Sequence, residues 1–209
     1  IGRHGTVFTV EMPLGAGVRE LVSQLELLVL TVNVNAREAL LRVAWADGPR
    51  AELRTASLLR EKIPQALWSV VGETEIRLGR SRVCYATPDQ LMTLEGSFAL
   101  IQIVDAQTLD EAELEKVRLL ARASGATAVF YGRPSHEETP FERLKATNRS
   151  LQGVDGRLRH FRVPLERALA ELPKLSSRVS AARQAMGETH PDYRAHYELL
   201  SGNDTGVAA

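Results

Sequence analysis

The stretch that decides the fold reads Val7-Phe-Thr-Val-Glu-Met-Pro-Leu-Gly-Ala-Gly-Val-Arg-Glu20. Alternation and β-branched residues over 7–11 predict a strand, and Pro and Gly over 12–17 predict a turn. Apolar residues then recur at helical spacing over 21–29 and predict a helix. A loop that leaves a strand and opens a helix can hold a phosphate, because its backbone N–H groups and the helix dipole face the anion. The candidate phosphate-binding residues are Pro13, Gly15, Ala16, Gly17, Arg19 and Glu20.

Two interpretations of this loop remain open from its residues. In a working phosphate loop, lysine would follow Gly17 to reach the β- and γ-phosphates, and a hydroxyl or amide near magnesium would come next. Val18 and Arg19 stand at those positions. The glycines therefore either cradle a phosphate or make a tight strand-to-helix turn. Arg19 either takes the place of the lysine or lies in solvent, because consecutive helical residues point about 100° apart.

Buried strands alternate with helices along the next part of the chain. Apolar runs predict strands at 39–46, 99–104 and 128–131, with helices at 51–63 and 108–123. Thr108 is expected to cap the second helix, with Glu111 bonding back to it. The segments 75–78 and 82–85 flank a Gly-Arg-Ser turn and predict a hairpin at the sheet edge. A strand at 158–163 and proline-interrupted helical segments are expected to pack on the sheet. The alternation predicts an α/β fold with a mostly parallel sheet and helices on both faces.

An acidic residue follows the second buried strand, in Leu100-Ile-Gln-Ile-Val-Asp105-Ala106-Gln107. The carboxyl end of a strand is where ligands bind in open α/β sheets. Asp105 could therefore hold Mg²⁺, or it could only hydrogen-bond a neighbouring loop. Asp110 and Glu111 could supply a second carboxylate, although their position favours helix capping.

Five stretches, taken in order, resemble the N-terminal ATPase domain of phage large terminases. The loop at 13–20 is the first, and the run at 100–107 resembles the family's Val-Asp-Glu-Ala-Gln without its glutamate. The third, 124–134, is similar to a strand that ends in Tyr-Gly-Thr-Pro, with Arg133 in place of threonine. The fourth, 159–164, resembles the strand that follows. The fifth is Gly187-Glu-Thr-His-Pro and its continuation to Leu200, similar to the passage into the family's nuclease.

The resemblance implies a three-layer P-loop NTPase fold of the RecA-like (ASCE) type, with an added β-hairpin and a C-terminal helical segment. It implies an ATPase domain over 1–201, with a core at 1–152 and a packing segment at 153–201, while 202–209 would be a tail or the start of a linker. An RNase H-like nuclease would begin after about residue 201. The implied cofactors are ATP and Mg²⁺, with Asp105 as a magnesium ligand. Gly132, Arg133 and Pro134 would form the loop that couples nucleotide state to DNA movement, and Arg133 could bind a phosphate or pair with Asp105.

Three functional hypotheses follow. The first is a terminase-like pseudo-ATPase, because the lysine and the glutamate that phosphoryl transfer needs are missing. The second is a non-enzymatic assembly or DNA-contacting module, from a decayed prophage or recruited for protein interactions. A basic surface around Arg3, Arg19, Arg37, Arg42 and Arg50 would favour it. The third is active hydrolysis with a group from a neighbouring subunit. Double-stranded DNA, other packaging proteins and further copies of the chain are the implied partners.

Composition restricts these hypotheses only slightly. Lysine plus arginine and aspartate plus glutamate number 26 each, so no overall basic field indicates nucleic acid. No apolar run is long enough to span a bilayer, and we expect a cytoplasmic protein without a membrane partner. The single cysteine, Cys84, is expected to be a small buried hydrophobe. The five histidines lack the spacing of a metal site.

Overall fold

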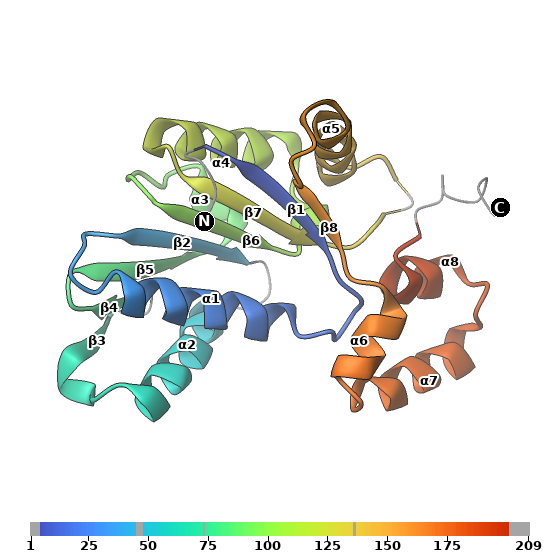
Figure 1. Ribbon diagram of the computed structural model, residues 1–209, viewed down its shortest axis with the longest axis horizontal. Coiled ribbons are helices and arrows are strands. Elements are labelled where there is room, and N and C mark those ends of the chain that lie inside the picture. Colours follow the sequence, from blue (N-terminus) through green and yellow to red (C-terminus); the bar gives the residue numbers. More distant parts are fainter. Residues whose placement is uncertain (1–4, 45–47, 73, 136, 201–209) are drawn as a thin grey trace. The chain divides into compact units, whose positions relative to one another are not determined.

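The computed structural model describes residues 5–44, 48–72, 74–135 and 137–200 (Figure 1). The strands are β1 (Val7–Glu11), β2 (Ala39–Ala44), β3 (Trp68–Val71), β4 (Glu75–Leu78), β5 (Ser81–Ala86), β6 (Leu100–Val104), β7 (Thr127–Gly132) and β8 (His160–Arg162). The α-helices are α1 (Val18–Val32), α2 (Gly48–Lys62), α3 (Pro88–Leu91), α4 (Glu111–Ser124), α5 (Pro140–Asp155), α6 (Leu165–Glu171), α7 (Leu175–Met186) and α8 (Pro191–Tyr193). Short helical turns are η1 (Gln65–Leu67), η2 (Ala106–Thr108) and η3 (Arg194–Glu198).

The strands form one eight-stranded sheet in the order β3-β4-β5-β2-β6-β7-β1-β8. β2 pairs in parallel with β5 and β6, and β1 pairs in parallel with β8. The predicted hairpin is confirmed, since β4 runs antiparallel to β5. β3, a short strand that pairs antiparallel with β4 beyond the hairpin, was not predicted from the sequence. The predicted mostly parallel α/β sheet is thus confirmed. Trp45, expected in a core strand, lies outside the described residues.

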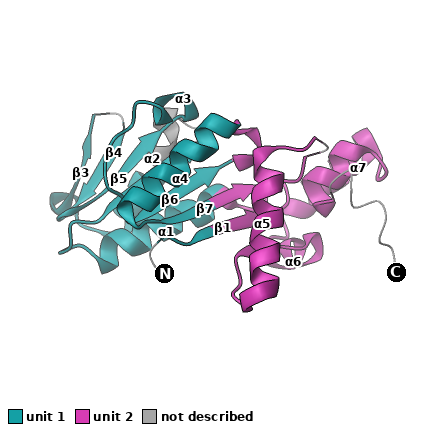
Figure 2. Ribbon diagram, turned by 90° about the horizontal axis from the view of Figure 1, so that it is seen from above, with its two compact units in different colours: residues 1–7, 19–104, 111–129 teal, residues 8–18, 105–110, 130–209 magenta. Residues whose placement is uncertain are grey.

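The chain divides into two compact units, coloured separately in Figure 2. Unit 1 comprises residues 1–7, 19–104 and 111–129. In it, α1 and α2 cover one face of the sheet and α3 and α4 the other (Figure 1). Every residue of β6 is buried, as expected for a strand covered on both faces. The core on the α1 and α2 side is apolar and includes Leu30, Leu59, Ile76 and Val83.

Unit 2 comprises residues 8–18, 105–110 and 130–209. Its core joins α6, α7 and α8 to the loop that follows β1, and its buried members are Ala16, Ala168, Leu175, Val179, Tyr193 and Tyr197. Met12 and Leu14 of the same loop pack against this cluster. The C-terminal segment therefore differs from the prediction that it packs on the sheet. β8 joins the sheet as a strand, whereas α6 and α7 bury their apolar residues with the loop.

The buried face of α1 also differs from the face that apolar spacing predicts. Leu21 and Leu28 are exposed, whereas Ser23 and Glu26 are completely buried. The reason is a charged partner on β2: Arg42 donates to the Ser23 hydroxyl and makes two hydrogen bonds with the Glu26 carboxylate, at 2.6 and 2.8 Å. A periodicity argument that counts only apolar residues cannot find a helix face built around an ion pair.

Candidate functional site

The loop between β1 and α1 has the backbone of a strand-to-helix turn that requires glycine. Gly15 and Gly17 have φ values of +84° and +85°. Residues with a Cβ rarely adopt a positive φ, so the backbone conformation of this loop favours glycine at both positions. Among the described residues, neither glycine's N–H has a hydrogen-bond partner. The predicted strand-to-helix turn is therefore present, and phosphate binding by its two glycine amides stays a prediction.

Two hydrogen bonds hold the same loop in place. The Leu14 N–H donates to the carbonyl of His196 at 2.8 Å, and the Ala16 N–H donates to the carbonyl of Pro13 at 3.0 Å. His196 belongs to the C-terminal stretch 187–200 that carries part of the terminase resemblance. Tyr193 and Tyr197 of that stretch are buried with Ala16 in the core of unit 2. The C-terminal stretch therefore supports the loop.

The two remaining candidates of the first site, Arg19 and Glu20, lie in unit 1, unlike loop 13–17. Glu20 is exposed and forms an ion pair with Arg54 of α2. Arg19 is half-buried. A surface ion pair is the arrangement this structure shows for Glu20, and its role at a phosphate stays a prediction.

Asp105 directly follows β6 and carries the left-handed backbone, with φ +58°. Its Oδ1 lies 3.6 Å from Nη2 of Arg133, and the two side chains are 25% and 23% exposed. Non-glycine residues in the left-handed region cost about 1–3 kcal/mol and cluster at functional sites. Of the alternatives for Arg133, the structure shows the pair with Asp105.

The Nε of Arg133 is buried and, among the described residues, has no hydrogen-bond partner. The same carboxylate that would hold a metal therefore already faces a guanidinium with an unsatisfied donor. No group of three acidic, histidine or cysteine side chains in the described part of the chain has the geometry of a metal site. Magnesium at Asp105 stays a prediction.

Gln107 connects the end of β6 to the predicted coupling loop, a role that was not predicted from the sequence. Its Oε1 accepts a hydrogen bond from the Arg133 N–H at 3.1 Å. A Cβ at Gly132 would lie 2.6 Å from the Phe141 ring and 3.0 Å from the Gln107 Oε1, so only glycine fits there. Pro134 is buried beside them. Gly132 and Arg133 thus lie against the segment that carries Asp105.

A chain of polar contacts continues from this loop to the end of β1. The Ser135 N–H donates to Glu142 Oε1 at 3.0 Å, and Lys145 Nζ lies 2.8 Å from the same oxygen. Lys145 is buried and also donates to Glu11 Oε1 at 2.5 Å. Glu11 is the last residue of β1 and directly precedes the glycine loop. The polar chain therefore connects the coupling loop with the strand that leads into the phosphate loop.

Glu11 stays charged although it is completely buried. Burial raises the pKa of this carboxyl. A hydrogen bond from His160 and the charge of Lys145 together lower it by more than burial raises it, so the net shift of the pKa is downward. Two nitrogens approach Glu11 Oε2: His160 Nε2 lies 3.3 Å from this oxygen, and Arg149 Nη2 lies 3.5 Å from the same oxygen. Lys145 lies in a helix among other polar residues, and nothing in the sequence signals that it is buried. The cluster around Glu11 was therefore not predicted.

The predicted basic surface is wrong at Arg42. Its side chain is only 2% exposed and pairs with Glu26, which also accepts hydrogen bonds from Thr55 at 2.6 Å and Tyr85 at 3.1 Å. Arg37 is exposed, as predicted, and Arg19 is half-buried. Arg3 and the side chain of Arg50 lie outside the described residues.

Two smaller expectations also change. α4 begins at Glu111, and Thr108 lies in η2, where its hydroxyl donates to the Asp105 carbonyl at 2.6 Å in place of capping the helix. Cys84 is half-buried, not buried. Burial raises the pKa of its thiol to about 11, with the nearby Glu75 carboxylate also contributing, so little reactive thiolate forms at neutral pH.

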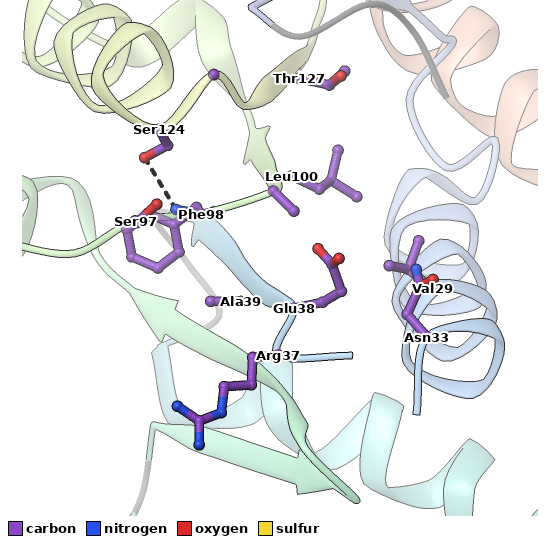
Figure 3. A pocket seen from close by; sticks show the side chains of 12 residues that line it. Val29, Asn33, Arg37, Glu38, Ala39, Ser97, Phe98, Leu100, Ser124 and Thr127 are labelled. Atoms are coloured by element: carbon purple, nitrogen blue, oxygen red, sulfur yellow. Dashed lines mark hydrogen bonds between the residues drawn. The ribbon is translucent and has the colours of Figure 1, made fainter. Parts of the chain in front are cut away.

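A hollow of about 410 Å³ lies in unit 1 at the amino ends of β2, β6 and β7. Figure 3 shows its lining, with the Ser124 hydroxyl accepting a hydrogen bond from the Phe98 N–H at 3.0 Å and the Glu38 carboxylate in the opening. Ligands of open α/β sheets bind outside the carboxyl ends of the strands. None of the residues predicted for the nucleotide site or the coupling loop lines this hollow, although Arg37 of the hypothetical basic surface does.

Among the described residues, no helix is long and apolar enough to cross a membrane. No protein-family model matches the sequence, and no curated protein matches it.

Solved structures do match the chain along most of its length. The large terminase of a thermophilic bacteriophage is 12% identical with a TM-score of 0.65, covering 95% of this chain and 48% of that one. The ATPase domain of the Thermus phage P74-26 large terminase is 11% identical with a TM-score of 0.68, covering 95% and 90%. The large terminase of bacteriophage HK97 is 10% identical with a TM-score of 0.68, covering 92% and 46%.

The chain spans about half the length of the whole terminases and nine-tenths of the separate ATPase domain. The thermophilic-phage terminase has also been solved with ADP and with ATP-gamma-S. Identities of 10–14% carry a fold and not an activity. The chain has the fold of the ATPase domain of phage large terminases.

Proposed function

We propose that this chain is an ATPase-type domain of a phage DNA-packaging motor that hydrolyses ATP weakly or not at all. The observation that carries the proposal is the state of Asp105. Its carboxylate faces the Arg133 guanidinium, and the next residue is a buried alanine, not a glutamate. The fold would be kept, whereas the rate of ATP hydrolysis would be lowered or lost.

The physical case rests on what phosphoryl transfer requires. The developing charge on the phosphate oxygens must be neutralised, and the attacking water must be oriented. Val18 supplies no charge, and Ala106 supplies no base. Removing one such group typically costs about 10²–10³ in rate, so the loss of two leaves little turnover.

ATP is the proposed ligand of loop 13–17, because structural neighbours were solved with ADP and ATP-gamma-S. Magnesium would bind at Asp105 only if Arg133 releases the carboxylate. Gly132, Arg133 and Pro134 would couple the site to α5 through Gln107 and Glu142. We further propose residues 1–201 as one domain with a core at 1–152 and a packing segment at 153–201.

Double-stranded DNA, packaging proteins and further copies of the chain are the proposed partners, by analogy with the motor context that the fold suggests. DNA binding would have to use a local basic patch because the net charge is zero.

The test is a turnover assay with magnesium-ATP, with and without double-stranded DNA. We expect phosphate release indistinguishable from that of an Asp105→Asn variant under both conditions. Turnover on the order of 1–100 s⁻¹, the range of working phosphoryl-transfer enzymes, and its loss in Asp105→Asn would refute the pseudo-ATPase proposal. DNA binding is measured separately by its dependence on salt concentration.

A further inference from the structure

Arg178, on the C-terminal helix α7, lies against the glycine loop. A Cβ built on Gly15 would come within 2.5 Å of Arg178 Nη1 and 3.2 Å of its Cδ. The Arg178 guanidinium therefore occupies space beside Gly15 that a side chain at position 15 would need. Both residues belong to unit 2, so their placement relative to each other is part of one compact body.

The Arg178 side chain is exposed. Among the described residues, Arg178 forms no hydrogen bond and no ion pair. Arg183 on the same helix shows the usual alternative, because it pairs with Glu188 at 3.0 Å and contacts the Tyr193 hydroxyl at 3.3 Å. The donors of Arg178 therefore face solvent next to the loop, where an anion could replace water as their acceptor.

Packing holds this arginine at the loop. Leu175 and Val179, three residues before Arg178 and one after it, are buried in the unit 2 core together with Ala16 of the loop. Residues three and four apart share one face of a helix, so Leu175 and Val179 anchor the face from which Arg178 projects. The Leu175 side chain itself would lie 3.3 Å from a Cβ at Gly15.

We propose that Arg178 supplies the cation that the loop lacks at Val18, and that the ligand it receives is the phosphate chain of a nucleoside triphosphate. This inference rests on the proposed function and names how the same site would recognise its ligand. A guanidinium offers paired N–H donors that match phosphate oxygens. The N–H groups of Gly15 and Gly17 are available on the same loop. The lysine function would thus come from a distant part of the sequence.

The experiment titrates the full chain with three probes, a non-hydrolysable ATP analogue, inorganic tripolyphosphate and adenosine. Binding is measured by calorimetry for the wild type, Arg178→Ala, Arg178→Lys and Lys174→Ala. Lys174 is the matched control because it is an exposed cation at the start of the same helix. Thermal melting of each variant shows whether it is folded.

We expect the ATP analogue and tripolyphosphate to bind the wild type and adenosine to bind much more weakly. Arg178→Ala should weaken both phosphate-bearing probes by about 10-fold to 100-fold, the usual cost of losing a hydrogen bond to a charged group. Arg178→Lys should retain part of the affinity, and Lys174→Ala should match the wild type.

Three results would overturn the inference. They are no binding of either phosphate probe to the wild type, equal binding by Arg178→Ala and the wild type, and an equal loss in Lys174→Ala. None of these results bears on turnover, so the pseudo-ATPase proposal stands or falls in its own assay. Conversely, rapid turnover would refute that proposal and leave the Arg178 comparison intact.

Discussion

Gly15 and Gly153 show how the same residue type has opposite roles in one chain. Gly15 has φ +84° and faces Arg178, whereas Gly153 lies within α5 with no atom within 4 Å of a built Cβ. We expect Gly15→Ala to lower the free energy of unfolding by about 1 kcal/mol, because alanine is strained at positive φ. Gly153→Ala should raise it by about 0.5–1 kcal/mol. Urea denaturation measures both, and a Gly15→Ala variant as stable as the wild type would contradict the argument.

The two ion pairs of α1 differ in burial and should differ in energetic weight. Glu26 and its partner Arg42 are 1% and 2% exposed, whereas Glu20 and Arg54 are 62% and 41% exposed. Glu26→Gln leaves a buried guanidinium without its charge partner, and we expect a loss of about 3–5 kcal/mol. Glu20→Gln, the matched control on the same helix, should cost about 0–1 kcal/mol. Equal losses in chemical denaturation would show that burial does not decide the difference.

At the scale of elements, the stability that strand β1 contributes to the fold depends on pH through Glu11. The folded state lowers the pKa of this carboxyl, so the charged form contributes stability above its unfolded pKa of about 4.3, and that stability is lost as pH falls through the lower folded pKa. We expect the wild type to lose stability below about pH 4, and Glu11→Gln to show a smaller loss over the same range. Unfolding free energies from pH 7 down to pH 3 measure this, and parallel curves for the two proteins would count against the network.

Helix α5 follows the coupling loop and begins with a side-chain cap. The Thr139 hydroxyl accepts a hydrogen bond from the Glu142 N–H at 3.3 Å, and Pro140 occupies the first helical position. Thr139→Ala should destabilise the protein by about 1 kcal/mol, whereas Thr139→Ser should be nearly neutral because serine caps as well. Thermal denaturation distinguishes the two, and an equal loss in both variants would point to the threonine methyl and not to the cap.

At the scale of the whole molecule, unit 2 is assembled from separate parts of the sequence. Residues 8–18 contribute Met12, Leu14 and Ala16 to its core, and Glu11 pairs with Lys145. We expect a fragment of residues 130–200 to be unfolded, because its apolar core and its buried lysine lack the partners that residues 8–18 provide. Circular dichroism and the dispersion of amide signals in NMR spectra measure this. A cooperative thermal transition in that fragment would contradict this.

Local sequence patterns were enough to predict most of the helices and strands without knowledge of tertiary contacts. Alternation over 7–11, the Gly-rich turn and the buried runs at 99–104 and 128–131 each predicted an element that the structure contains, because backbone preference and short-range periodicity act within one segment. β3 was missed because a strand of only four residues gives too little periodicity.

What only the tertiary structure decided is which side chains meet. Asp105 and Arg133 are 28 positions apart, and Gly15 and Arg178 are 163 apart, by their numbers in the sequence. Loops and helices from distant segments bring these charges together, and a single sequence has no local signal for such contacts. The same reason explains the burial of Glu26, Arg42 and Lys145, which composition alone would have placed at the surface. The sequence by itself determined the α/β fold and placed Val18 after the glycine loop and Ala106 after Asp105. The tertiary structure decided that Arg133 faces Asp105 and that Arg178 lies beside the loop, because these contacts join distant segments.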